Sequence, residues 1–458
     1  MRGRLPLSRR LLVSVLATII AFPVGSWPPA VEGTTGGSPY DIPSVIDTNG
    51  DANIVETTIT ANETDVSIGG GVTAHAYTYN DTIPGPEFRL TVGQRVIVHF
   101  NNELTEPTGI HWHGIELQNP SDGTPLTQNQ VPAGGSFTYD FVVRRPGVYW
   151  YHPHHEFSTN QVFKGLYGSI IVTDPNESAL ITAGKLPSLA NTRTLALSDM
   201  TVCKAPTTND TATYNPALPW AGPGGILPVQ QTPTPAWLCE AATALDNHGE
   251  LKGSAWAAGD IPNIQRHSQR VNEGQTVLTN GVNVGARAGT PAAPGAVDPG
   301  AYKLAVAPGQ GLRLRIGNAA TTRFFHLHLT NNLGIDQPLY RVGGEGGLLD
   351  AVELDGKVAS GFDFDYNEGE ILLDPGDRTD VVIAFPLAAA GVWTLWTEDF
   401  RRSGGGDSAT GWMNLPTVPV AHFDLSLPAL VTAFSISEGT GLRSSTGDPV
   451  QVLPPATG

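Results

Sequence analysis

Apolar and polar residues alternate in short runs through the first third of the chain. In Arg95–Phe100, Val96 and Val98 fall on one side of an extended strand, and Ile97 and His99 fall on the other. This two-residue period is typical of a strand with one buried face. Further strands are predicted at Val55–Ala61, Ala74–Tyr79, Phe137–Val143, Val148–His152 and Gly168–Thr173. Glycine and proline turns separate them, and the even spacing predicts a Greek-key sandwich.

A second series of strand-like runs begins after an irregular segment. Residues 203–260 are rich in proline, threonine, alanine and glycine and predict loops, whereas Asn280-Gly281 is a hairpin turn signal. Strands are predicted at Gln275–Asn280, Tyr302–Val306, Gly311–Ile316, Arg323–Thr330, Glu370–Leu373, Thr379–Phe385, Val392–Thr397 and Val418–Leu425. We therefore predict an all-β protein with two sandwich domains, at residues 45–176 and 180–427, followed by a linker-like tail at 428–458.

The N-terminus predicts a targeting segment. Four arginines within the first ten residues precede the apolar run 11–24, and small residues follow at Gly25 and Ser26. Such a run is too short for a comfortable membrane span, so residues 1–30 are expected to be a signal peptide. Residues 8–12 resemble a twin-arginine export signal, with ordinary secretion as the alternative. An exported protein, periplasmic or extracellular, without membrane insertion after signal removal, is the expectation.

Charge and cysteine content narrow the possible functions. A formal net charge of −17 argues against nucleic acid and against an anionic membrane surface as partners. Cys203 and Cys239 are the two cysteines, and in an oxidising compartment one disulfide is the default, although the sequence leaves this pairing open. Neither cysteine has a neighbouring histidine, so neither is expected to bind metal.

Two His-x-His pairs carry the strongest chemical signal. His111 and His113 flank Trp112, and His152 and His154 follow an aromatic run. Alternate residues of a strand point to the same side, so two neighbouring strands could converge four imidazoles on one point. Imidazole suits copper, zinc, iron and nickel, and the residue types alone do not name the metal. The plainer alternative is a set of hydrogen-bonded core histidines.

Two groups of motifs, in order and spacing, resemble the multicopper oxidases of the laccase and bilirubin-oxidase kind. The first group consists of Tyr79-Asn80, Ile83-Pro84-Gly85-Pro86, Gly93, His111-Trp112-His113-Gly114, Trp150-Tyr151-His152-Pro153-His154, Gln161, Gly165-Leu166 and Gly168. The second, looser group consists of Asn280-Gly281, residues 312–318 and residues 372–381. The resemblance implies two cupredoxin-like domains, the second without copper.

This resemblance also implies a set of roles. His111 would bind the type 2 copper, and His113, His152 and His154 the type 3 pair of a trinuclear cluster. Asp122 matches the acidic residue that helps to deliver protons in the family, although a plain turn aspartate before Gly123 explains it equally well. The implied partners are O2 and a small organic reductant such as a phenol or aromatic amine.

The chain departs from the family pattern in one respect. It contains no His-Cys-His and no His-Pro-x-His-x-His run, which hold the type 1 site and the other half of the cluster. A third cupredoxin domain or a neighbouring subunit would have to complete the sites, and the chain alone is expected to be inactive. The alternatives are a truncated chain, a natural short form, or a non-catalytic cupredoxin-fold envelope or copper-binding protein.

A third pair, His326 and His328, lies on a predicted strand of the second domain. The family carries no copper ligands there, so a structural or polar-lining role is expected. An accessory metal or a contact between domains is the alternative.

Overall fold

The computed structural model describes residues 38–69, 73–155, 158–200, 276–356, 366–398 and 417–443, together with the backbone of two short strands, β10 (Val202–Cys203) and β11 (Ala236–Leu238). The predicted signal peptide, Cys239 and most of the predicted loop 203–260 lie outside these residues, so the disulfide stays a prediction. In the described ranges, no helix has the length and apolar character needed to cross a membrane.

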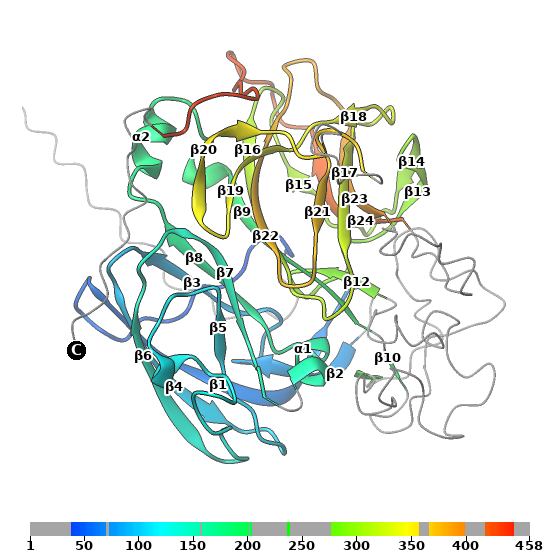
Figure 1. Ribbon diagram of the computed structural model, residues 1–458. Helices are drawn as coiled ribbons and strands as arrows, with labels where there is room; N and C mark the ends of the chain where they lie inside the picture. The colour runs from blue at the N-terminus through cyan, green and yellow to red at the C-terminus, as the bar shows by residue number, and fades with distance from the viewer. Residues whose placement is uncertain are drawn as a thin grey trace, which may run out of the picture. The chain divides into compact units, whose positions relative to one another are not determined.

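The first half of the described chain forms two sheets packed face to face (Figure 1). One sheet has the order β10-β11-β2-β1-β4-β6, with β1 (Ile54–Ser67), β2 (Thr73–Tyr79), β4 (Arg95–Asn102) and β6 (Ser136–Val142). The other has the order β3-β8-β7-β5, with β3 (Gly85–Thr91), β5 (His111–His113), β7 (Gly147–His152) and β8 (Gly168–Thr173). Val96 and Val98 are buried and His99 is exposed, as the alternation predicts.

The second half repeats this arrangement. One sheet has the order β12-β9-β16-β22-β19-β20, with β9 (Thr192–Met200), β12 (Thr276–Thr279), β16 (Gly311–Asn318), β19 (Tyr340–Gly344), β20 (Gly347–Glu353) and β22 (Arg378–Ala384). The facing sheet has the order β15-β24-β23-β17-β18, with β15 (Leu304–Ala305), β17 (Phe325–Thr330), β18 (Asp336–Gln337), β23 (Val392–Glu398) and β24 (Val418–Asp424), and β21 (Ile371–Leu373) pairs with β17. A separate hairpin joins β13 (Arg287–Thr290) and β14 (Ala293–Val297).

The all-β prediction is confirmed, and the described ranges add four short helical turns that the sequence reading did not include. They are α1 (Ser158–Phe163), α2 (Glu177–Thr182) and the 3-10 turns η1 (Asn119–Ser121) and η2 (Leu189–Asn191). The Ile83-Pro84-Gly85-Pro86 motif contains a cis Ile83–Pro84 peptide and leads directly into β3. Asn280 and Gly281 both have positive φ, as the predicted hairpin turn requires.

Each sandwich has its own apolar core, and the two sandwiches contact each other. Trp112 and Tyr139 belong to the first core, whereas Phe325 and Trp393 belong to the second. At the contact, the Nε–H of Arg378 donates to the Val148 carbonyl over 3.2 Å. The domain boundaries predicted from sequence stay predictions, because the cores do not fix where one domain ends.

The first part of the predicted linker-like tail lies against the second sandwich. The Phe434 ring packs on Gly311, where a Cβ would come within 2.5 Å of it. The Gly439 N–H donates to the Val352 carbonyl over 2.9 Å, and Leu442 is buried. Residues 428–443 are therefore held to strands β16 and β20, while residues 444–458 lie outside the described ranges.

Candidate metal centre

The pairing of β5 with β7 brings the two histidine motifs together. His111 lies opposite His152, Trp112 opposite Tyr151, and His113 opposite Trp150. Directly paired residues of antiparallel strands share a face. Three histidines and Trp150 therefore line one side of the sheet, while Trp112 and Tyr151 point into the core and are fully buried. The aromatic residues between the histidines anchor the strands that present them.

The three histidines have the spacing of ligands to one ion. Single ring nitrogens of His111, His113 and His152 all lie within 4.8 Å of one another. The His113 Nδ1 and His152 Nε2 atoms are 3.1 Å apart. Metal–imidazole bonds of about 2.0–2.1 Å, at angles between square-planar and tetrahedral, separate two nitrogens by about 2.8–3.4 Å. The donor set therefore fits a metal that prefers nitrogen ligands, copper included.

Backbone carbonyls fix which nitrogen of two rings is free to bind. The Nδ1–H of His111 donates to the Asp122 carbonyl over 2.7 Å, and that of His152 donates to the Pro153 carbonyl over 2.7 Å. In each ring the Nε2 lone pair is then available as a ligand. Such hydrogen bonds from the second nitrogen are usual for metal-binding histidines, because they orient the ring and select its tautomer.

His154 lies at the edge of this group. Its ring centroid is 5.0 Å from that of His111 and 6.0 Å from that of His152, and its side chain is exposed. The group of nitrogens within 4.8 Å does not include it. The structure thus brings three of the four predicted ligands together and places the fourth beside them.

Burial keeps these imidazoles neutral. It lowers the pKa of His113 to about 3, with further lowering from the charge of Arg378 and from the neighbouring His111 and His154. Burial and the neighbouring histidines hold the pKa of His152 well below its usual value, and burial also lowers the pKa of His111. Neutral imidazole is the form that binds metal, so the site is ready for a cation at neutral pH.

Residues of the second sandwich also lie against the histidine group, which the sequence did not predict. Gly376, in the turn before β22, lies so close that a Cβ there would be 3.5 Å from His113 Cε1. From the first sandwich, Trp150 of β7 stacks on His152, with ring centroids 3.9 Å apart and planes at 24°. Arg378 Nη1 donates to the Gly376 carbonyl over 2.5 Å and pairs with Glu345 at 2.5 Å. The resemblance marked this turn only as a family motif.

Asp122 lies both in a turn and beside the histidine group. Its backbone N–H donates to the Asn119 carbonyl over 3.1 Å, which makes it a turn residue at the end of η1. Its carboxylate also lies beside the histidines, with Oδ1 3.6 Å from His111 Nδ1, while Oδ2 accepts a hydrogen bond from Thr124 Oγ1 over 2.8 Å. The carboxylate is therefore a near neighbour of the His111 ring.

His326 and His328 lie elsewhere, on β17 in the second sandwich. Both are buried and contact carboxylates, with His326 Nε2 2.7 Å from Glu370 and His328 Nε2 2.9 Å from Asp336. They do not join the first group of histidines.

Comparison with known sequences gives a family for part of the chain. The family model for multicopper oxidases matches residues 60–177. The multicopper oxidase MmcO of Mycobacterium tuberculosis is 45% identical over 124 residues, which are 27% of this chain and 24% of that protein. Laccase-2 of Cryptococcus neoformans var. grubii is 44% identical over 105 residues, 22% of this chain and 17% of that protein. The matches thus span about a quarter of these relatives or less.

Solved structures extend the likeness of fold to most of the chain. The 2F4 variant of the McoA multicopper oxidase from Aquifex aeolicus has a TM-score of 0.59 at 22% identity, covering 89% of this chain and 68% of that one. A multicopper oxidase from Campylobacter jejuni, a metallo-oxidase, has a TM-score of 0.55 at 20% identity, covering 89% and 64%. At these identities the likeness concerns the fold, and it confirms the cupredoxin-like sandwiches.

Proposed function

We propose that this chain, whose residues 60–177 match the family model for multicopper oxidases, is the part of a laccase-like oxidase that supplies half of its trinuclear copper cluster. The whole protein would oxidise phenolic or aromatic reductants by one electron at a time and reduce O2 to water, with four electrons and four protons for each O2. The observation that carries this proposal is the convergence of His111, His113 and His152 on one point.

When bound, copper supplies the redox chemistry, and the residues of this chain hold and shield it. His111, His113, His152 and His154 are the proposed ligands, the first for the type 2 copper and the others for the type 3 pair. Burial favours neutral nitrogens, and the Asp122 and Pro153 carbonyls aim Nε2 of His111 and His152 at the site. Asp122, whose Oδ1 lies 3.6 Å from His111 Nδ1, would help to deliver protons to reduced oxygen.

The remaining ligands would come from outside the described chain, either from a third cupredoxin domain or from a neighbouring subunit. The protein would work after export, in the periplasm or outside the cell, as the predicted signal peptide indicates. Intact mass of the protein purified from its source distinguishes the two sources of ligands. A mass above 48.3 kDa by one domain favours the third domain, whereas a smaller mass favours a shared subunit site.

Copper content tests the proposal directly. The protein is loaded with copper, passed through a desalting column, and its copper-to-protein ratio is measured for the wild type, His113→Ala and His152→Ala. Both variants should retain less copper than the wild type. His99→Gln is the matched control, because His99 lies on the exposed face of β4 and pairs with Glu56 at 2.8 Å. Unchanged copper in both site variants would refute the assignment.

Oxygen uptake with a phenolic reductant separates the oxidase from the non-catalytic alternative. The protein purified from its source should consume O2, and the His152→Ala form expressed in the same host should not. Copper binding without oxygen uptake in the natural protein would favour a copper-binding envelope protein instead.

A further inference from the structure

His154 is the one proposed copper ligand that the sheet itself does not hold. Strand β7 ends at His152, two residues earlier, and the His154 ring lies at the edge of the histidine group, with its centroid 5.0 Å from that of His111. Among the described residues, neither the backbone nor the imidazole of His154 forms a hydrogen bond. The chain on either side of His154 must therefore set where its ring lies.

The chain that follows His154 is anchored by Gln161, in the short helix α1. Gln161 is 1% exposed, and its amide bonds to the loop that leads into β5. Its Nε2 donates to Glu106 Oε1 over 2.8 Å and to the Pro107 carbonyl over 3.0 Å, while its Oε1 accepts a hydrogen bond from Thr108 Oγ1 over 2.8 Å. Because both N–H groups and the oxygen have partners, one orientation of the amide satisfies all three contacts.

The loop that Gln161 contacts is itself held to the first sandwich. Thr108 and Val131 exchange two backbone hydrogen bonds, of 3.0 and 2.7 Å. Asn102, at the end of β4, donates from its Nδ2 to the Val131 carbonyl over 2.9 Å. Three residues after Thr108, the chain reaches His111. Gln161 therefore joins the segment after one histidine motif to the segment before the other.

A second contact joins the same two segments closer to the histidines. The buried His155 ring, next to His154, lies against Gly109, where an added Cβ would be 3.1 Å from the His155 Cδ2 atom. Among the described residues, His155 Nε2 has no hydrogen-bond partner, so this contact is one of packing. Packing alone is not directional, whereas the three hydrogen bonds of Gln161 are. Without the Gln161 amide, the two segments should still touch but should be free to shift.

We propose that Gln161 is a positioning residue for His154 and keeps its ring within reach of the metal site, an inference that rests on the copper ligands proposed above. The pairing of β5 with β7 places His111, His113 and His152 without help from Gln161. His154 lies beyond that pairing and depends on the segment that Gln161 anchors. A change at Gln161 should therefore affect one histidine of the four, which a general loss of stability would not do.

The metal-free protein provides the first test. Labelling with 15N-histidine gives one backbone N–H signal for each histidine, and His154→Ala identifies the signal of interest. In the wild type, the order parameter of the His154 N–H should be about 0.85, as in rigid backbone, and in Gln161→Leu it should fall below about 0.6. The His113 N–H should stay rigid in both proteins. A mobile His154 in the wild type, or a rigid one in Gln161→Leu, would overturn the proposal.

Two substitutions of Glu106 test the same hydrogen bond from a partly exposed side chain, so they should fold even if Gln161→Leu does not. Glu106→Leu removes the acceptor of the Gln161 amide and should make His154 more mobile. Glu106→Gln keeps a side-chain oxygen that can accept the same hydrogen bond, so it should leave His154 rigid. Equal mobility of His154 in the two variants would contradict the proposal.

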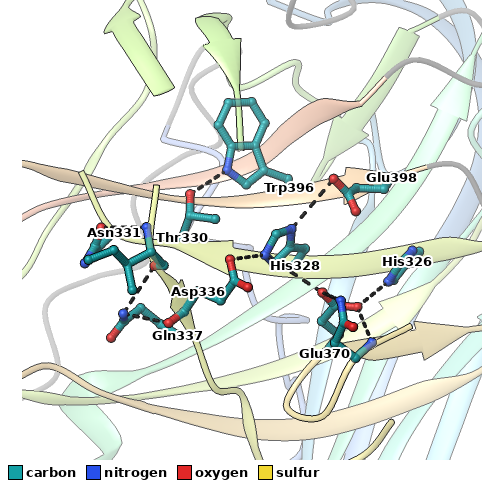
Figure 2. Close-up of polar contacts among 11 residues, drawn as sticks. His326, His328, Thr330, Asn331, Asp336, Gln337, Glu370, Trp396 and Glu398 are labelled. Atoms are coloured by element: carbon teal, nitrogen blue, oxygen red, sulfur yellow. Dashed lines mark hydrogen bonds and ion pairs between the residues drawn. The ribbon is translucent and has the colours of Figure 1, made fainter. Parts of the chain in front are cut away.

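Gln337→Leu is the matched control for Gln161→Leu. The Gln337 amide also donates to backbone carbonyls, those of Ile335 and Asp336 over 3.2 and 2.7 Å, but in the second sandwich (Figure 2). The substitution removes the same kind of hydrogen bond without a contact to either copper-site motif. It should leave the order parameter of His154 unchanged, and a decrease as large as in Gln161→Leu would count against a specific role for Gln161.

Copper binding then shows whether Gln161 acts through His154. Gln161→Leu and His154→Ala should each weaken copper binding by about 10-fold or more, and the double variant should bind no more weakly than His154→Ala. The same further loss in the His154→Ala background would show that Gln161 acts elsewhere and would overturn the proposal. A wild type that binds no copper would refute the proposed function, whereas the order parameter of His154 in the metal-free protein decides on Gln161 by itself.

Discussion

The Nδ1 atom of His113 lies 3.1 Å from the Nε2 atom of His152, although the two residues are not direct partners in the sheet. His113 faces Trp150 across the strands and His152 faces His111, so the close nitrogens lie on a diagonal. The diagonal brings a δ nitrogen and an ε nitrogen to the same point, which neither strand could do alone. The geometry of the site therefore depends on the register of β5 against β7.

The turn that holds His111 should be sensitive to any side chain at Gly123. This glycine has a φ of 76°, and a Cβ there would lie 1.7 Å from the Ile110 carbonyl oxygen. Gly123→Ala should therefore lower the free energy of unfolding by about 2 kcal/mol or more and reduce copper retention, because the Asp122 carbonyl that orients His111 must move. Denaturant unfolding and copper content measure both effects.

Gly134→Ala is the matched control for Gly123→Ala. Gly134 has a φ of 71°, but a Cβ added there would meet no atom of the described residues within 4 Å, so only the backbone strain remains. The substitution should cost about 1 kcal/mol and leave copper retention unchanged. Equal effects at the two glycines would contradict the steric argument.

Arg378 should link the second sandwich to the copper site. Its buried guanidinium donates to the Val148 and Gly376 carbonyls and pairs with Glu345. Arg378→Met leaves these acceptors without a donor and should cost about 2–4 kcal/mol of unfolding free energy. The pKa of His113 should rise, because the Arg378 charge helps to lower it. Denaturant unfolding and NMR titration of His113 in the metal-free protein provide the readouts.

Arg145→Met serves as the control for Arg378→Met, because Arg145 is half exposed and pairs with Glu116 at 3.0 Å. Its loss should change stability by less than about 1 kcal/mol. A similar small effect at Arg378 would show that the contact between the sandwiches does not depend on it.

His422 should make the second sandwich sensitive to acid. Burial lowers its pKa to about 4 from the usual 6.5, and the neutral ring bonds the Gly285 carbonyl and Thr394 Oγ1, each over 3.1 Å. Between these two pKa values the unfolded chain binds the proton and the folded protein does not. Stability should therefore fall as pH drops from about 6.5 to about 4, by at most about 3 kcal/mol.

His422→Gln removes that titration and tests the direction of the predicted pH dependence of stability. The variant should be less stable than the wild type at pH 7.5, but its stability should decline less between pH 6.5 and pH 4. Guanidinium unfolding, followed by tryptophan fluorescence at several pH values, gives the two slopes. Identical slopes would rule out His422 as a source of acid sensitivity.

Trp112 should matter for both the core and the copper site. It is fully buried and packs edge-on against Phe88 and Tyr139, with centroids 5.5 and 5.4 Å apart. Trp112→Ala should cost about 3–5 kcal/mol and reduce copper retention, because its strand carries His111 and His113 on the other face. Trp112→Phe should recover much of the lost stability and of the lost copper retention. Normal copper retention in a folded Trp112→Ala protein would show that the strand holds its histidines without this anchor.

Local patterns in the sequence determined many of the strands and the residues that face the proposed metal site. Alternation predicted β4 with Val96 and Val98 inside, and the His-x-His spacing predicted that His111 and His113 share a face. Both are properties of a strand by itself, because its side chains alternate whatever it pairs with. The hairpin at Asn280-Gly281 was equally local, since positive φ at both positions is a matter of residue type. Strands β19 and β20 were missed, because their glycine-rich sequence, Gly343-Gly344 and Gly346-Gly347, predicts turns.

Only the tertiary structure decided what surrounds those histidines. The register that sets His111 opposite His152, the approach of Gly376 to His113, and the Arg378 contact with Val148 all join residues far apart in the chain. His326 and His328 show the same limit, because their spacing matches that of the copper motifs while their neighbours are Glu370, Asp336 and Glu398. The spacing of residues along a strand predicts which side chains point the same way. What they point at depends on the packing of the whole sandwich, because those partners come from strands and loops that are distant in sequence.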